Sequence, residues 1–418
     1  MKKLYPVSLG CPKNKADFEK FLFLLKKQGW DFVLFPEKAD VIWINTCAFI
    51  RPAVEEALDH IFELAELKKD SQKLVVSGCL TARYGRKKLK ELLPEVDEFF
   101  GIEPFLLYSP EEPFERVLTE SPFYAYVKIA EGCNRRCSYC TIPEIRGTLR
   151  SKSPEFILKE TEYLLKLGVK EIILVAQDLT SYGKDLGEKE GLLKLIKMLS
   201  QLPFNFRIRL LYLFPSDITR ELVEEVISNP KVVPYFDMPV QHSHPEILKK
   251  MRRPADKEKW LEIMEWIRKL NPLAGIRSTV MVGFPGEGEK EFIDLCEFIK
   301  EAQFDYLGVF TFYAEEGTPA EKFKQKVPYK EKLRRKREIL RIQREITKTN
   351  LKRRIGTEEE ILVLGEDTRG RCWGITGFQA PEIDGIAYIT EKRRILPGEL
   401  IKVKIKKTGR YDVWCRIF

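Results

Sequence analysis

The sequence has little imidazole, with only three histidines among 418 residues. It contains no H-E-x-x-H zinc-protease motif, no G-x-S-x-G nucleophile motif and no G-x4-G-K-[ST] phosphate-binding loop. These absences argue against a zinc protease, a serine hydrolase and a nucleotide hydrolase. A secretory signal and an apolar run long enough to span a bilayer are also missing. We therefore expect a cytoplasmic protein that makes no contact with a membrane.

The cysteines are the most informative residues of this sequence. Nine cysteines is an odd number and does not suit a secreted disulfide framework. Three of them, Cys133, Cys137 and Cys140, form a C-x3-C-x2-C pattern in the stretch EGCNRRCSYCTIP. A structural zinc site needs four ligands, and no second cysteine or histidine arm follows at suitable spacing. A [4Fe-4S] cluster held by three thiolates leaves one iron open to a small molecule, and we favour this interpretation over zinc or incidental buried cysteines.

Three more cysteines follow apolar, strand-like runs in the first hundred residues. Cys11 follows YPVSLG, Cys47 follows DVIWINT and Cys79 follows KLVVSG, with helical patterns between them. This alternation predicts an α/β unit with a parallel sheet. Because the carboxyl ends of parallel strands share one edge, we expect these cysteines to meet there, as a second ligand set.

The next region alternates strand-like runs with helical patterns, which predicts a partial or full parallel β/α barrel with its site at the carboxyl ends of the strands. The last region has short alternating runs broken by glycines, which predicts a small OB-like β barrel. We place the three domains at residues 1–105, 119–348 and 351–418. Cys296, Cys372 and Cys415 are interpreted as structural. Polar residues at the predicted strand ends of the middle region include Gln177, Asp178, Asp237, Gln241, His242 and the GFPGE turn, 283–287.

Positive charge gathers between the last two domains. Residues 322–354 hold 15 Lys or Arg and 3 Glu, a net charge of +12, while the whole chain carries +9. Such a segment can bind RNA or the ribosome surface, or it can be a solvated linking helix. Ile339, Ile342 and Ile346 recur at helical spacing, so one face of this helix should be packed.

With all six cysteines placed, the whole chain resembles the radical S-adenosylmethionine (SAM) methylthiotransferases, in which a TRAM domain forms the last barrel. The resemblance implies two [4Fe-4S] clusters, one held by Cys11, Cys47 and Cys79 and one by Cys133, Cys137 and Cys140, with SAM on the second of these. Positions at strand ends make Gln177, Arg277, Ser278 and Thr279 candidate SAM neighbours, although they can equally be ordinary polar residues of the barrel. Gly283 and Gly286 would let the backbone approach SAM.

Four stretches resemble the branch of this family that modifies an aspartate in the twelfth protein of the small ribosomal subunit: GCPKN at 10–14, VAQDLTSYG at 175–183, YLFP at 212–215 and APEIDG at 380–385. Residues 355–418 carry 11 Lys or Arg and 10 Asp or Glu, less basic than expected of a barrel that grips tRNA. We expect that barrel to meet the ribosomal protein. The basic segment keeps the other branch, which modifies a tRNA adenosine, as the alternative. A non-catalytic RNA-binding protein is more remote.

The expected mechanism follows from the target bond. Neither a carboxylate nor an imidazole can usefully deprotonate the aspartate β-carbon, so a carbon radical is required. We expect a deoxyadenosyl radical from SAM to abstract hydrogen there, sulfur on the second cluster to couple to the carbon, and a second SAM to supply the methyl group. Both clusters must then face one cavity between the first two domains. An electron donor and a sulfur donor are expected partners.

Overall fold

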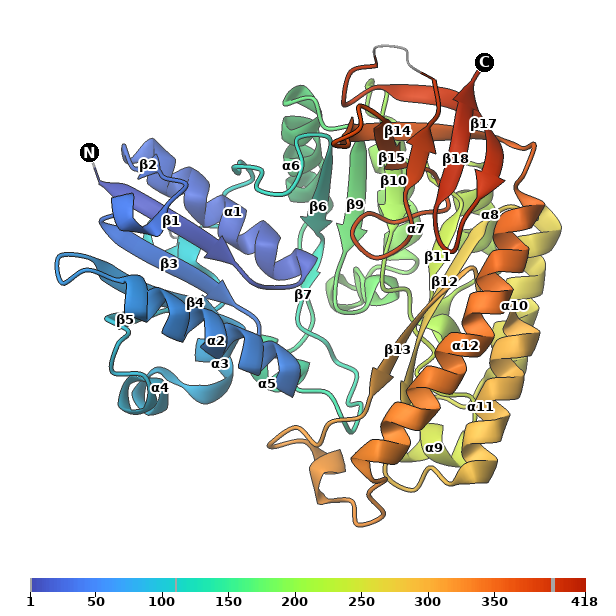
Figure 1. Ribbon diagram of the computed structural model, residues 1–418, viewed down its shortest axis with the longest axis horizontal. Coiled ribbons are helices and arrows are strands. Elements are labelled where there is room, and N and C mark those ends of the chain that lie inside the picture. The colour runs from blue at the N-terminus through green and yellow to red at the C-terminus, as the bar shows by residue number, and fades with distance from the viewer. Residues whose placement is uncertain (1, 110, 392–394) are drawn as a thin grey trace.

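The computed structural model describes residues 2–109, 111–391 and 395–418. Three regions follow one another along the chain, and each has its own sheet or barrel (Figure 1). Within the described residues, no helix is long and apolar enough to cross a membrane.

The first region is a five-stranded parallel sheet with the strand order β2-β1-β3-β4-β5. Helix α1 packs on one face through Phe18 and Phe21 against Trp43, and α2 packs on the other through Ile61 against Ile42. Burial on both faces explains why the β3 sequence is almost continuously apolar. The elements are β1 (Lys3–Ser8), α1 (Pro12–Lys27), β2 (Asp31–Phe32), β3 (Val41–Thr46), α2 (Arg51–Leu67), β4 (Lys73–Gly78), α3 (Cys79–Tyr84), α4 (Arg86–Leu92) and β5 (Glu98–Phe99).

The second region is a partial barrel. Two three-stranded parallel sheets, β10-β9-β6 and β11-β12-β13, are joined by one bridge between Ile208 and Val232. Of the two predicted forms, partial or full barrel, the structure therefore has the partial one. Its strands are β6 (Tyr124–Lys128), β9 (Glu171–Val175), β10 (Arg207–Leu210), β11 (Tyr235–Asp237), β12 (Gly275–Val282) and β13 (Tyr306–Thr311), with a short pair β7 (Ala130–Glu131) and β8 (Arg150–Ser151).

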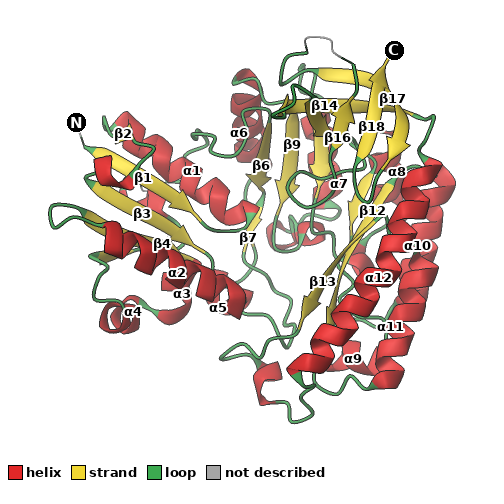
Figure 2. Cartoon of the chain, viewed as in Figure 1, coloured by secondary structure: helices red, strands yellow, loops and turns green. Residues whose placement is uncertain are grey.

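Helices cover the outer face of this partial barrel (Figure 2). Ile157, Leu195 and Val223 come from three of them and share one core with the outward residues of the strands. The covering helices are α6 (Pro154–Lys166), α7 (Gly191–Ser200), α8 (Arg220–Ser228), α9 (Pro245–Lys250), α10 (Lys257–Leu270) and α11 (Glu289–Ala302). The short helix α5 (Ile142–Arg146) lies instead against the first region, where Ile145 joins the core.

The basic segment forms the long helix α12 (Tyr329–Arg353), which runs from the partial barrel to the last region. Ile339, Ile342 and Ile346 are buried in the core of the partial barrel, which confirms the predicted packed face. Several of its cations already have partners, such as Arg335 with Glu287 at 2.9 Å.

The last region is a closed five-stranded barrel, as predicted. Its strands are β14 (Glu358–Glu366), β15 (Cys372–Ile375), β16 (Ala387–Ile389), β17 (Leu400–Thr408) and β18 (Val413–Ile417). Arg207 and Arg209 of β10 share Glu171 and donate hydrogen bonds to the carbonyls of Ile375 and Thr376, both at 3.0 Å. These bonds fasten the small barrel to the partial barrel. Cys372 and Cys415 are buried in the small barrel, and Cys296 is buried in α11, which suits structural roles.

Candidate active site

Cys11, Cys47 and Cys79 lie at one edge of the first sheet. Cys11 begins α1 soon after β1, Cys47 directly follows β3, and Cys79 directly follows β4. These three strands are neighbours in the sheet and run parallel, so their carboxyl ends coincide. The order 2-1-3-4-5 places a topological switch point between β1 and β3, where ligands of open α/β sheets bind. The sheet therefore assembles a three-thiol set from positions 36 and 32 residues apart.

The three thiols influence one another electrostatically. Burial raises the pKa of the Cys47 thiol to about 12, and the charges of Cys11 and Cys79 add to the effect. Burial also raises the pKa of the Cys79 thiol, against the opposing charge of Arg146. Burial acts in the same direction on Cys11, but Lys13 and Arg146 outweigh it and lower the pKa of that thiol. Such a set favours thiolates only when positive charge is placed among them.

Cys133, Cys137 and Cys140 lie in one loop between β7 and α5. The backbone N–H of Arg135 donates to the Cys133 sulfur at 3.3 Å, and Arg253 Nη1 lies 3.9 Å from the Cys137 sulfur. Burial raises the pKa of the Cys140 thiol to about 12, and burial raises that of Cys133 as well. The three thiols are half-buried, Asn134 and Arg136 between them are exposed, and a cation lies beside Cys137.

The two sets suit clusters better than single ions. Among the described residues, no group of three or more His, Cys, Asp or Glu side chains is arranged to hold a metal ion. A structural zinc ion would need four ligands converging on one point. All nine cysteines are free thiols, so no cysteine of either set forms a disulfide. A set of three thiols matches the ligands of a [4Fe-4S] cluster with one open iron.

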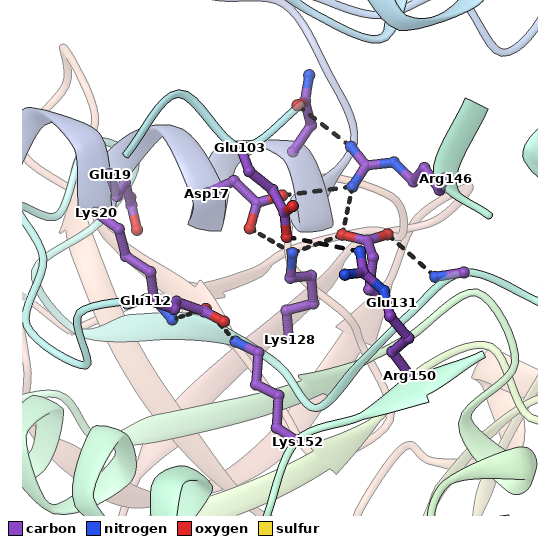
Figure 3. Close-up of polar contacts among 12 residues, drawn as sticks. Asp17, Glu19, Lys20, Glu103, Glu112, Lys128, Glu131, Arg146, Arg150 and Lys152 are labelled. Carbon is purple, nitrogen blue, oxygen red and sulfur yellow. Dashed lines mark hydrogen bonds and ion pairs between the residues drawn. The ribbon is translucent and has the colours of Figure 1, made fainter. Parts of the chain in front are cut away.

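Arg146 links the second region to the first three-thiol set. It ends α5, just after the second cysteine loop, and its Nη2 lies 3.4 Å from the sulfur of Cys79 in the first region. The same guanidinium contacts Asp17 Oδ2 at 3.3 Å and Glu131 Oε2 at 2.8 Å (Figure 3). A residue of the second region therefore reaches a thiol of the first. Thr141, next to Cys140, also donates to the carbonyl of Phe49, two residues after Cys47, at 3.1 Å, so both three-thiol sets lie near the same interface.

Buried ion pairs fill that interface. Lys128 of β6 pairs with Asp17 of α1 and, at 2.6 Å, with Glu131 (Figure 3). Burial alone would raise the pKa of Glu131, but Lys128 and Arg146 hold it far below its usual range. A second group joins Lys20 with Glu112, and with Glu160 at 2.9 Å. Buried pairs of this kind add little net stability over apolar packing, but removing one partner is costly, so they enforce one docking geometry.

The SAM candidates are not equivalent in the structure. Gln177 donates from Nε2 to Glu131 Oε1 at 2.9 Å, while its buried Oε1 has no hydrogen-bond partner among the described residues. Arg277 and Thr279 share one face of β12, whereas Ser278 is buried on the other face and donates to the Met238 carbonyl at 2.7 Å. Of the three β12 candidates, only Arg277 and Thr279 share a face that is partly open.

The two glycines of the GFPGE turn approach side chains of the protein itself. Gly283 has a φ of +75°, and a Cβ there would lie 2.3 Å from the Lys332 side chain. Gly286 has a φ of +87°, and a Cβ would lie 2.0 Å from Lys250 Nζ. Both positions favour glycine because of their left-handed φ, independently of SAM; the crowding is less strict at Gly286, where the close atom ends a flexible lysine side chain.

Of the other strand-end residues, some lie beside the site and one is a core residue. Asp178 accepts from Arg135 Nε at 2.9 Å and Asp237 from Arg277 Nη1 at 2.9 Å, so both lie beside site residues. His242 is instead fully buried, with its Nε2 3.8 Å from Glu287 Oε2 behind the GFPGE turn. We assign it to packing.

Comparison with known proteins decides the family. Family models match three parts of the chain: residues 3–101 match "Uncharacterized protein family UPF0004", residues 127–299 the radical SAM superfamily and residues 355–417 the TRAM domain. Curated proteins named ribosomal protein uS12 methylthiotransferase RimO match nearly end to end. The one from Thermoanaerobacter sp. (strain X514) is 42% identical, covering 99% of each chain, and the one from Thermotoga maritima is 42% identical, covering 97% of each. The chain belongs to the RimO family of radical SAM methylthiotransferases.

Solved structures agree on the fold. A radical SAM methyltransferase, TsrM from Kitasatospora setae with cobalamin and a [4Fe-4S] cluster bound, gives a TM-score of 0.53 at 13% identity and covers 77% of each chain. The cobalamin-dependent radical enzyme OxsB gives 0.51 at 12% identity, covering 82% of this chain and 56% of its own. RimO family membership makes the protein a SAM-dependent, [4Fe-4S]-containing enzyme.

Several site residues of this RimO family member were missed from the sequence: Lys13, Glu131, Arg146, Tyr212 and Arg253. Two of them carried a signal, because Glu131 and Arg146 flank the cysteine loop on either side. A buried cysteine loop needs charge compensation, and charged residues at its borders are the nearest source. Lys13 follows Cys11 by two residues, but its neighbour Tyr212 is 199 positions away and comes close only through domain docking.

Proposed function

We propose that this protein is a methylthiotransferase that inserts sulfur and a methyl group at the β-carbon of an aspartate in ribosomal protein uS12. The observation that carries the proposal is the juxtaposition of two three-thiol sets across one buried interface, with Arg146 touching both domains. The near full-length identity to RimO proteins supports the choice of substrate. Methylthiolation of a tRNA adenosine is not favoured by these relatives.

We assign the cofactors to the cysteines. Cys133, Cys137 and Cys140 would hold the cluster that binds SAM, and Cys11, Cys47 and Cys79 the second cluster. When bound, these groups supply the electron that cleaves SAM and the sulfur that is transferred. For SAM itself, the unpartnered Oε1 of Gln177 is an acceptor suited to the SAM amino group. Arg277 and Thr279 are secondary candidates, and Ser278, Gly283 and Gly286 retain only a weaker case.

The protein's own residues control the interface between the first region and the partial barrel. The Lys128, Asp17, Glu131 and Arg146 pairs fix the first region against the partial barrel and leave little room for water there. Arg253 donates to the Pro239 carbonyl at 2.8 Å and so keeps a cation beside Cys137. A rigid, water-poor site protects a carbon radical from side reactions.

We further propose the division of labour among the domains. Residues 1–105 would present sulfur, residues 119–348 would bind and cleave SAM, and residues 351–418 would contact uS12. An electron donor and a sulfur donor are required as external partners, and the cytoplasm is the compartment in which ribosomal protein is available. The exposed cations of α12 are available for a ribosome surface.

The test is an anaerobic reaction with reconstituted protein, SAM, dithionite and sulfide. Ribosomal protein uS12 and unmodified tRNA are offered in parallel, and both are examined by mass spectrometry. The proposal predicts a methylthio mass increase on one aspartate of uS12. An increase on a tRNA adenosine alone would refute the substrate but keep the chemistry.

A further inference from the structure

Lys13 is an exception among the buried cations. The described part of the chain has nine Lys or Arg side chains in its buried class, and eight of them have a carboxylate oxygen within 4.0 Å. Lys13 is only 8% exposed, yet no described carboxylate lies that close to its Nζ. The nine are Lys13, Lys20, Arg116, Lys128, Arg146, Arg207, Arg209, Arg335 and Arg354.

The ammonium of Lys13 lies instead over an aromatic ring of the other domain. Its Nζ is 3.7 Å from the centroid of the Tyr212 ring. A cation–π contact compensates a buried charge only in part, since it is weaker than a close carboxylate. A buried cation that has a ring and the neighbouring Cys11 thiol beside it, but no carboxylate, can receive a carboxylate from a substrate.

Tyr212 is held as a fixed platform. It lies just beyond β10, with a left-handed φ of 66°, which is costly for a non-glycine residue. Its backbone N–H donates to Asp237 Oδ2 at 3.0 Å, and its carbonyl accepts from the Leu179 N–H at 3.0 Å. Strain that the surroundings enforce in this way is typical of a functional position.

Lys13 lies where the first region meets the partial barrel, since its ammonium is over the Tyr212 ring. The charges that act on its ammonium belong to Cys11 of the first set, to Arg146 and Glu131 beside the second, and to Asp237 of the partial barrel. A substrate carbon that receives sulfur from one side and loses hydrogen on the other must lie in this same space. In an aspartate, that β-carbon is bonded directly to the carboxylate carbon. A cation that grips the carboxylate therefore fixes the reacting carbon.

The other cations near this interface already have partners within the protein. Arg277 pairs with Asp237 at 2.9 Å and with Asp384 at 3.4 Å, and Arg146 is shared between Asp17 and Glu131. Arg253 has no carboxylate partner among the described residues, but it donates to the Pro239 carbonyl and faces Cys137, on the SAM side. Lys13 is the cation best placed for a substrate anion.

We propose that Lys13 binds the side-chain carboxylate of the substrate aspartate, with Tyr212 as its platform, and so makes the enzyme select aspartate over asparagine. This inference rests on the proposed function, because it assumes an aspartate of uS12 as the substrate. It adds a specificity-determining residue that contacts the substrate and not a cluster.

The test is an internal competition. Wild-type and variant enzymes receive equal amounts of uS12 and of uS12 with the target aspartate changed to asparagine, and mass spectrometry gives the ratio of the two products. A charge-assisted hydrogen bond corresponds to a preference of about tenfold or more for aspartate in the wild type. Lys13→Met should reduce it to less than about threefold, and Lys13→Arg should restore much of it. A ratio within one variant is not altered by a general loss of folding or cluster content.

The matched control is Lys15→Met, two positions along the same helix. Lys15 pairs with Glu120 at 2.7 Å and with Glu382 at 3.2 Å. Lys15→Met should therefore leave the preference for aspartate at the wild-type value. If Lys13→Met is inactive on both substrates, the ratio of their Kd values, measured by fluorescence anisotropy on reconstituted enzyme, replaces the product ratio and should fall in the same way.

Two results would overturn the inference. One is an unchanged aspartate preference in Lys13→Met. The other is an unchanged preference together with a raised KM for SAM, which would assign Lys13 to the SAM carboxylate. If the wild type does not modify uS12 at all, the proposed function fails first and the inference falls with it. If the wild type does modify uS12, only the role of Lys13 is in question.

Discussion

The two cysteine sets reach similar chemistry by different routes. Cys133, Cys137 and Cys140 occupy eight consecutive positions of one loop, so their spacing in sequence already fixes their proximity. Cys11, Cys47 and Cys79 are separated by 36 and 32 residues and meet only because three parallel strands end together. A local set needs only its own loop, whereas a dispersed set depends on the whole sheet and its docking. The two sets should therefore respond differently to mutation.

The largest expected effect is on the local set. Cys137→Ala removes one of three ligands from the loop, and SAM cleavage should fall to the background without enzyme. The measurement is 5'-deoxyadenosine formation under reducing, anaerobic conditions. Retained cleavage would show that this loop does not hold the SAM cluster.

A change in the dispersed set should separate SAM cleavage from sulfur insertion. Cys47→Ala should keep SAM cleavage within about threefold of wild type, because the loop is intact, but should abolish the methylthio product. Bound iron should fall by about four atoms per chain, the content of one [4Fe-4S] cluster. Continued product formation would remove the dispersed set from the mechanism. Cys296→Ala is the control, since that cysteine is buried in α11, away from both sets, and should change neither readout.

Arg146 tests how the two sets are linked. Arg146→Met leaves the buried carboxylates of Asp17 and Glu131 with Lys128 as the one cation that pairs with both, and removing one member of a buried charge group costs about 3 to 5 kcal/mol. The loss should appear as faster hydrogen exchange in α1 and β6, the two sides of the interface. Arg341→Met removes an exposed pair with Glu338 and should leave hydrogen exchange in α1 and β6 unchanged. Equal exchange in the two variants would mean that the interface does not depend on Arg146.

The smallest expected effect concerns a strand-end residue outside both sets. Burial lowers the pKa of His242 to about 3, from an ordinary value of 6.5. The charge of Asp294 favours the protonated form, but burial outweighs it, and the charges of His244 and Arg335 also lower this pKa. Because protonation is less favourable in the folded state, the contribution of His242 is fully present above about pH 6.5 and is lost as the pH falls towards 3. At pH 5 the loss is about 2 kcal/mol.

His242→Gln keeps an acceptor for the His244 N–H and cannot be protonated in this range. Thermal unfolding between pH 7 and pH 5 should therefore show a smaller decrease in Tm for the variant than for wild type. An equal decrease in Tm for the variant and the wild type would show that His242 does not limit stability at acid pH.

Much of the fold could be predicted because its signals are local. Strand runs such as those of β9 and β12 gave the parallel alternation, and the strand-end rule placed Cys11, Cys47 and Cys79 at one edge. The period of two along β12 could also have separated Ser278 from Arg277 and Thr279, because neighbouring residues of a strand point to opposite faces. The strand β15 was missed because Cys372–Ile375 is short and contains Gly374.

The rest depended on how the domains dock. Arg146 looks like an ordinary helix-end residue until the first region brings Cys79 within 3.4 Å of it. Lys13 and Tyr212 meet only across the same interface. Long-range partners of this kind are set by tertiary packing and carry no signal in local propensity.

The central claim is that each three-thiol set holds its own [4Fe-4S] cluster and that both face one cavity. The most direct measurement is anomalous diffraction at the iron edge from crystals of the anaerobically reconstituted protein. The account predicts two iron clusters, one at Cys133, Cys137 and Cys140 and one at Cys11, Cys47 and Cys79, on either side of Arg146. Iron at only one set, or a zinc signal at either, would contradict it.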